Sequence, residues 1–137
     1  MARYLSRADL SRIAGKYIDQ YYTRFGISKD DPEPIDPERL ASSVLGLNVK
    51  MLPLCSEGSV LGLTVFQKCD FTVTLGDGTK LVEVFMPKDV VIDSALAADS
   101  CTGCRNFTIA HEAAHHILVD LFPNDYGKAV KCRGHIA

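Results

Sequence analysis

Three residues near the end of the chain have the types and spacing of a catalytic metal site. His111, Glu112 and His115 form an H-E-x-x-H pattern. On a helix, residues four apart lie one turn apart and differ by only about 40°, so both imidazoles can face one ion. Glu112 lies about 100° round from His111, where it can reach a water bound to that ion. The pattern predicts Zn²⁺ held by His111 and His115.

This combination is typical of zinc peptidases. Zinc lowers the pKa of a bound water toward about 7, and Glu112 is expected to accept the proton as that water attacks a peptide carbonyl. Glu112 then returns the proton to the leaving amine. The plainer alternative is two ordinary histidines beside a helix-face carboxylate. The coincidence of motif, helix and register favours the metal site, with Glu112 as its catalytic base.

A catalytic zinc usually has three protein ligands and a water, so a third ligand is needed. Asp120 follows His111 by nine residues, which places it about 180° away on the same helix and out of reach. His116 lies about 140° from His111, and we expect it to be solvated or held by a neighbour rather than by zinc.

The residues after this helix offer further candidates that the sequence does not separate. Asp125, Cys132 and His135 could each supply the third ligand, and nothing in their spacing selects one. Tyr126 and His135 are candidate oxyanion donors by their chemistry alone.

A closed structural zinc site is an alternative. Cys101 and Cys104 form C-x-x-C ahead of His111 and His115, a set of four ligand types that zinc accepts. Only six residues separate Cys104 from His111, fewer than the usual spacing of about 12 to 15. Glu112 would also have no role, so the catalytic site is the preferred interpretation.

Helices are predicted on both sides of the central region. Apolar residues recur at three- and four-residue intervals over residues 6–25, with Ser6 and Asp9 as the N-terminal cap and Gly26 as the stop. After a proline-containing connector, Asp36 is predicted to cap a second short helix. The metal-site helix covers residues 107–121, and its apolar stripe of Ala110, Ala114, Ile117 and Leu121 is expected to face a sheet.

The middle of the chain changes to a strand-like pattern. Alternating residues at 47–51, followed by apolar segments at 60–66, 71–75, 81–85 and 90–92, predict a small sheet. Gly76, Asp77 and Gly78 are typical of a tight hairpin between the segments at 71–75 and 81–85. We therefore expect an α+β fold, a small, twisted, mainly antiparallel sheet packed by helices.

Bulk composition limits the class of protein. A chain of 137 residues fits a single domain, 1–137. The net charge of -2, from 15 basic and 17 acidic residues, argues against nucleic acid as a direct partner. No apolar run is long enough for a membrane span or signal peptide, which predicts a cytoplasmic protein with no membrane partner. In that compartment the five cysteines are expected to be free thiols.

The chain resembles the ImmA/IrrE family of zinc metallopeptidases. The resemblance rests on the first helix, on I-D-P-E-R-L-A-S-S-V-L-G at residues 35–46, on the strand at 90–93, and above all on R-N-F-T-I-A-H-E-A-A-H at residues 105–115. Family members often have Leu-Gly where this chain has Ala113 and Ala114. They usually continue into a further helix that supplies an acidic third ligand, so we expect this sequence to be a fragment cut before that helix.

The resemblance implies a zincin-like fold and a zinc endopeptidase that cleaves a helix-turn-helix transcriptional repressor, commonly in phages or mobile elements. The partner would be a protein substrate. A fragment without its third ligand could be inactive and bind zinc weakly. The competing hypothesis is a protein-binding module without catalysis. The substrate's identity, its cleavage site and the oligomeric state are not specified by the sequence.

Overall fold

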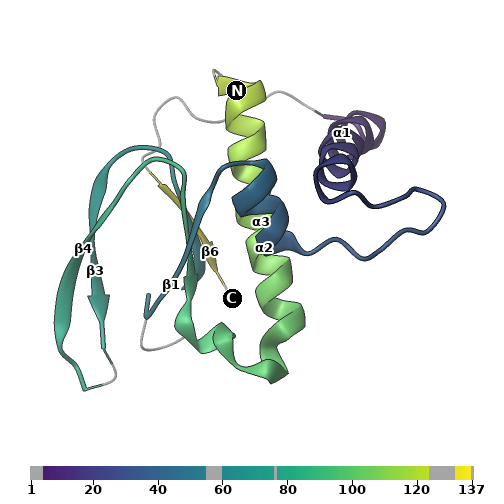
Figure 1. Cartoon of the computed structure of the whole chain (residues 1–137). Helices are drawn as coiled ribbons and strands as arrows, with labels where there is room; N and C mark the ends of the chain where they lie inside the picture. Colours follow the sequence, from purple (N-terminus) through teal and green to yellow (C-terminus); the bar gives the residue numbers. More distant parts are fainter. Residues whose placement is uncertain (1–4, 55–59, 76, 124–131, 137) are drawn as a thin grey trace.

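The computed structural model describes residues 5–54, 60–75, 77–123 and 132–136 of the chain (Figure 1). Its helical elements are α1 (Arg7–Phe25), α2 (Pro37–Arg39), the π-helical turn η1 (Leu40–Val44), the 3₁₀ turns η2 (Ser94–Ala97) and η3 (Asp99–Cys101), and α3 (Thr102–Leu121). The strands are β1 (Asn48–Leu52), β2 (Val60–Val65), β3 (Cys69–Thr74), β4 (Lys80–Phe85), β5 (Asp89–Asp93) and β6 (Cys132–Ile136). The expected α+β class is confirmed.

Helix α1 begins and ends where its sequence predicts. The Ser6 hydroxyl accepts from the Asp9 N–H at 3.1 Å, and the Asp9 carboxylate accepts from the Ser6 N–H at 3.1 Å. This capping box satisfies two N–H groups that lack partners at a helix start. Gly26 ends the helix with a φ of 64°, in the left-handed region that favours glycine.

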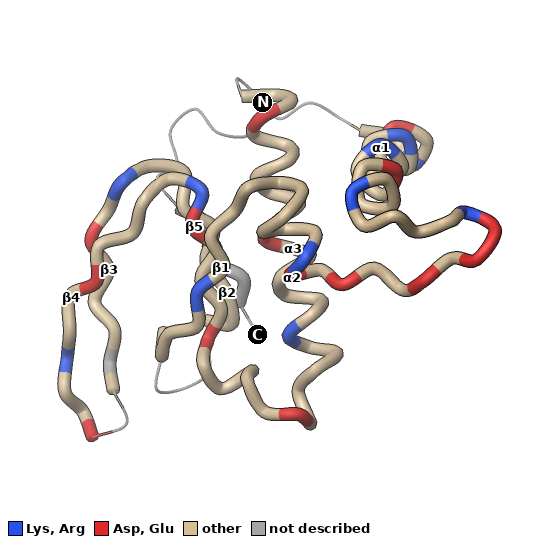
Figure 2. The backbone as a smooth tube through the Cα atoms, viewed as in Figure 1, with Lys and Arg blue, Asp and Glu red and all other residues tan. Residues whose placement is uncertain are grey.

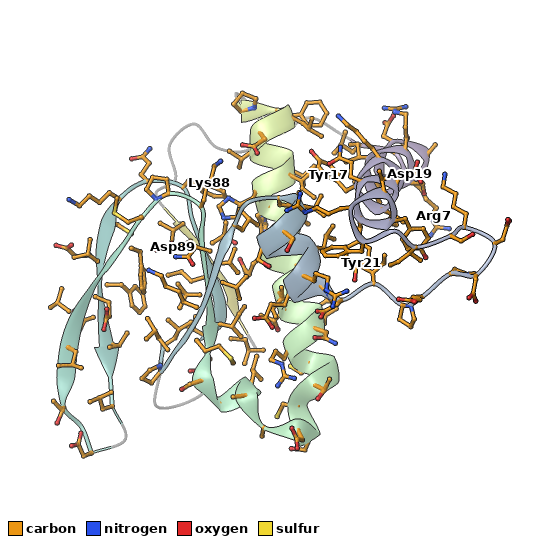
Figure 3. The ribbon with its side chains drawn as sticks, in the orientation of Figure 1. Arg7, Tyr17, Asp19, Tyr21, Lys88 and Asp89 are labelled. Atoms are coloured by element: carbon orange, nitrogen blue, oxygen red, sulfur yellow. The ribbon has the colours of Figure 1, made fainter. Side chains whose placement is uncertain are left out.

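The predicted second helix is present but irregular. Asp36 accepts from the Glu38 N–H at 3.1 Å, and Pro37 occupies the first helical position. After one short α-helical turn the chain continues as the π-helical turn η1. Tyr21, the one described α1 residue that is buried, reaches this region, where its hydroxyl accepts from the Asp36 N–H at 3.3 Å (Figure 3).

Four strands form one sheet in the order β1-β5-β2-β6. Strand β1 pairs with β5 in parallel, whereas β2 is antiparallel to both β5 and β6. Strands β3 and β4 form a separate antiparallel hairpin. Antiparallel pairings therefore predominate among the described strands, as expected, but the larger sheet is mixed, and β6 was not predicted.

The molecule is layered around strand β5, all of whose residues are buried. On one face, Val90 and Ile92 pack with Ile109 and Ala113 of α3. On the other face, Val91 packs with Leu63, Val65, Leu54 and Phe85, so the hairpin covers the side away from α3 (Figure 1). The prediction of a sheet packed by helices is correct for one face, and a second sheet covers the other.

A buried carboxylate joins three strands at one end of these layers. Asp89 is 2% exposed and accepts from Asn48 Nδ2 and Lys50 Nζ, each at 3.1 Å, and from the Met86 N–H at 2.9 Å (Figure 3). Because a buried charge is costly without partners, these three donors account for the carboxylate's position between β1 and the end of β4.

The hairpin turn has the predicted chemistry at its described residues. Gly78 has a φ of 88°, and the Asp77 carboxylate accepts from the Thr79 N–H at 2.9 Å. Gly76 lies outside the described residues. Among the described helices, none has the length and apolar character needed to cross a membrane.

Candidate metal centre on helix α3

The two motif histidines lie side by side on α3. Their Nε2 atoms are 3.2 Å apart, and the rings are inclined at 77° to each other. Two imidazole nitrogens bound tetrahedrally to one zinc ion, each at about 2.0 to 2.1 Å, lie about 3.3 to 3.4 Å apart. His111 and His115 therefore have the mutual spacing of two ligands of one zinc ion.

Glu112 is fully buried between α3 and β2, at 0% exposure. The Thr64 hydroxyl donates a short hydrogen bond to Glu112 Oε2. Glu112 Oε1 has no hydrogen-bond partner within the described parts of the chain. Burial raises the pKa of this carboxyl to about 7, and the Thr64 hydrogen bond partly opposes the rise.

Gly62 of β2 allows the helix to approach this closely. A Cβ added there would lie 2.7 Å from Thr108 Cγ2 and 3.2 Å from both Cγ and Oε1 of Glu112. The first distance is shorter than any normal carbon contact, so a larger residue would push α3 away from β2. Sequence reasoning missed Gly62 and Thr64, although a glycine within a strand pattern can indicate a close backbone approach.

The predicted sheet-facing stripe of α3 was wrong. The buried residues of the helix are Thr108, Ile109, Glu112, Ala113 and His116, whereas Ala110 and Ala114 are exposed. The physical reason is that α3 borders two neighbours. The side with Ala110 and Ala114 faces an apolar groove beside α1, while the side that contacts the sheet mixes apolar with polar residues.

His116 is buried rather than solvated. Its Nε2 lies 3.4 Å from the Asp89 carbonyl oxygen, and its ring meets Phe66 edge-on at 5.2 Å between centroids. Burial lowers the pKa of this imidazole. It is held by neighbours, which was one of the two expected environments, and it points toward β5.

The candidates for a third ligand are only partly described. Asp125 and Tyr126 lie outside the described residues, and for Cys132 and His135 the structure describes the backbone of β6, in which His135 pairs with Gly62. Asp120 lies close enough to His116 for its charge to oppose part of the lowering of the His116 pKa by burial. Within the described ranges no group of three His, Cys, Asp or Glu side chains could hold a metal ion.

The structure does not bring the four residues of the alternative structural site together. Cys101 is half-buried against the core and Cys104 is exposed on the first turn of α3. Cys104 and His111 are seven positions apart on one continuous helix, a rise of about 10 Å. All four residues lie within the described ranges, where no three His, Cys, Asp or Glu side chains are placed to hold one metal ion.

Known proteins add no constraint to this site. The chain matches no family model, no curated protein and no solved structure at a significant level.

Proposed function

We propose that the chain is a zinc-dependent peptidase domain in which His111 and His115 bind the metal and Glu112 is the catalytic base. The observation that carries the proposal is the 3.2 Å separation of the two Nε2 atoms, which fits two ligands of a tetrahedral zinc ion. Glu112 Oε1, on the same helix, has no hydrogen-bond donor among the described residues, which supports the proposal, because a buried polar atom in that position needs an explanation such as a catalytic role, a water or an ion.

Zinc at this position would acidify a water molecule and polarise a peptide carbonyl. The residues of the chain supply the remaining chemistry. Glu112 accepts the proton of the attacking water and passes it to the leaving amine. Thr64 holds Oε2, so that Oε1 is the oxygen available to the water. In the metal-free chain, burial raises the pKa of this carboxyl to about 7, which favours its uptake of a proton.

The substrate class comes from the sequence resemblance to the ImmA/IrrE family. On that basis we propose that the domain cleaves a helix-turn-helix transcriptional repressor, a protein partner that a net charge of -2 does not disfavour. Binding of such a repressor without cleavage is the competing function.

Metal content tests the first half of the proposal. After dialysis against zinc-containing and then zinc-free buffer, elemental analysis should find zinc in the wild-type chain. His111→Ala and His115→Ala should each lose most of it. His116→Ala is the matched control, since its ring points toward β5, and it should retain zinc. If His111→Ala and His115→Ala both retain the zinc content of the wild-type chain, the proposed site is refuted.

Cleavage tests the second half. The zinc-loaded chain is incubated with a candidate helix-turn-helix repressor, and fragments are identified by mass spectrometry. Glu112→Gln should abolish cleavage while retaining the metal, because it removes the base and leaves both histidines. If the repressor stays intact but still binds the wild-type chain, the chain is a binding module and not a peptidase.

A further inference from the structure

Strand β4 presents an unusual concentration of apolar side chains to solvent. Leu81, Val82, Val84 and Met86 are 45%, 67%, 49% and 47% exposed, whereas Phe85 between them is buried in the core. Val82, Val84 and Met86 alternate along the outer face of the hairpin. Strand pairing through the β4 edge would set these apolar side chains of two copies beside one another as cross-strand neighbours, so the stripe makes this edge a candidate interface.

Within the part of the chain that the structure describes, one backbone edge of β4 is unpaired. Among the described residues, β4 pairs with β3 alone (Figure 1). Leu75 donates its N–H to the Thr79 carbonyl at 2.8 Å, so these two residues form a hydrogen-bonded pair of the hairpin. In an antiparallel ladder, pairs that exchange hydrogen bonds alternate with pairs that do not, and the register places Lys80, Val82 and Val84 in pairs that do not. The N–H and C=O groups of Lys80, Val82 and Val84 therefore point away from β3.

Asp89 closes this edge at one end. The next residue of the outward-pointing series is Met86, whose N–H donates to the Asp89 carboxylate at 2.9 Å. Its carbonyl accepts from the Asp89 N–H at 3.1 Å. The edge that can accept another strand is thus limited to Lys80, Val82 and Val84.

We propose that two copies of the chain form a two-fold dimer in which β4 pairs antiparallel with β4, with Val82 opposite Val82 of the second copy. In this register Lys80 faces the second copy's Val84, so every outward-pointing residue falls in a pair that exchanges two hydrogen bonds. An axis at Lys80 would oppose two lysines. An axis at Val84 would require the backbone groups of Met86 that Asp89 already occupies.

Charges on the same face agree with this register. Asp70 of β3 lies opposite Val84. In the dimer, Lys80 of one copy lies beside Val84 of the second copy, and that Val84 lies beside Asp70 of the same second copy. The Cα atoms of Lys80 and Asp70 are then about 10 Å apart. An exposed lysine can extend over the valine and reach the carboxylate, and the two-fold axis repeats the pair.

Within one copy the same two residues do not meet. Asp70 lies opposite Val84, four positions along β4 from Lys80, which is about 13 Å of strand. Figure 2 shows that the hairpin carries only scattered charges along its length. The Lys80–Asp70 attraction is therefore available to a second copy of the chain.

The dimer should be weak. One strand pairing and its flanking side chains belong to the class of interfaces below about 1,200 Å², which associate transiently. Sedimentation velocity from low to high micromolar concentration should therefore show a shift from monomer to dimer. A monomer at every concentration would overturn the proposal.

Substitutions at the axis test the surface. Val82→Lys opposes two like charges and should raise the dimer dissociation constant by roughly tenfold or more. Val82→Pro should do the same while keeping the hairpin, because the Val82 N–H makes no bond to β3. Leu10→Lys, at a 48% exposed position on α1, is the control and should leave association unchanged. A dimer insensitive to Val82→Lys would place the interface elsewhere and overturn the proposal.

A charge exchange tests the register. Lys80→Glu and Asp70→Lys should each weaken association, because each creates a like-charged pair across the axis. The double variant should recover it. Failure of the double variant to recover what the single variants lose would overturn the Val82-centred dimer.

Discussion

Replacing Glu112 by Gln should change how the stability of the metal-free chain depends on pH. Burial raises the pKa of Glu112 from 4.5 to about 7 in the folded chain, so the folded state holds its proton over a range in which the unfolded state has lost it. The slope of the unfolding free energy with pH follows the difference in bound protons. For this group, stability is highest below the unfolded pKa and falls as the pH rises toward the folded one.

The size of the effect follows from the same shift. A rise from 4.5 to about 7 is about 2.5 pKa units, and one unit corresponds to about 1.4 kcal/mol, so ionisation of Glu112 costs the folded chain about 3 kcal/mol above pH 7. Glutamine does not titrate. The stability of Glu112→Gln relative to wild type should therefore rise by about 3 kcal/mol between about pH 4.5 and 8.

Urea unfolding followed by circular dichroism, in the presence of a metal chelator, measures this difference. Titrations of all other groups cancel when the two proteins are compared at each pH. Glu38→Gln, on the exposed surface of α2, is the control for the same acid-to-amide change at a carboxylate that is not buried. If the curves of Glu112→Gln and wild type are parallel, Glu112 ionises in the folded chain without cost, and the argument from burial is refuted.

Two further substitutions test the packing of the helices. Gly62→Ala should destabilise the fold by about 1 to 3 kcal/mol, because its Cβ would lie 2.7 Å from Thr108 Cγ2, whereas Gly103→Ala on α3, with open space at its Cβ, should not. Denaturant titration measures the unfolding free energy of both variants. Equal losses for Gly62→Ala and Gly103→Ala would mean that the contact between β2 and α3 is looser than described. Ser6→Ala should cost about 1 kcal/mol by removing the α1 cap. Ser11→Ala within the same helix is its control, and equal losses would rule out the capping box as the cause.

Local signals in the sequence predicted the elements that depend on neighbouring residues. Ser6 and Asp9 bond each other's backbone within one helical turn, and Gly26 ends the helix through its own φ angle. The H-E-x-x-H spacing likewise places His111 and His115 together on any regular helix. These features needed no distant contact, so the sequence contained all the information required.

The environment of the site depended on distant contacts. The sequence placed Ala110 and Ala114 against the sheet, whereas the structure buries Glu112 and His116 there and leaves the alanines beside α1. The positions of apolar residues on a helix show that one side is covered, but they do not show whether the sheet or another helix covers it. A buried carboxyl is also an unexpected choice until the Thr64 hydroxyl, 48 residues away, is seen to accompany it.

Strand pairing was the other feature decided by tertiary structure. The alternating pattern predicted strands but contained no information on which strands pair, so the parallel β1–β5 pairing, the strand β6 and the stacking of the hairpin on the sheet emerged only in three dimensions. Helix caps and turns are fixed by dihedral angles and hydrogen bonds over a few residues. Strand order and the depth of burial depend on the free energy of contacts between segments far apart in the chain, which no local pattern records.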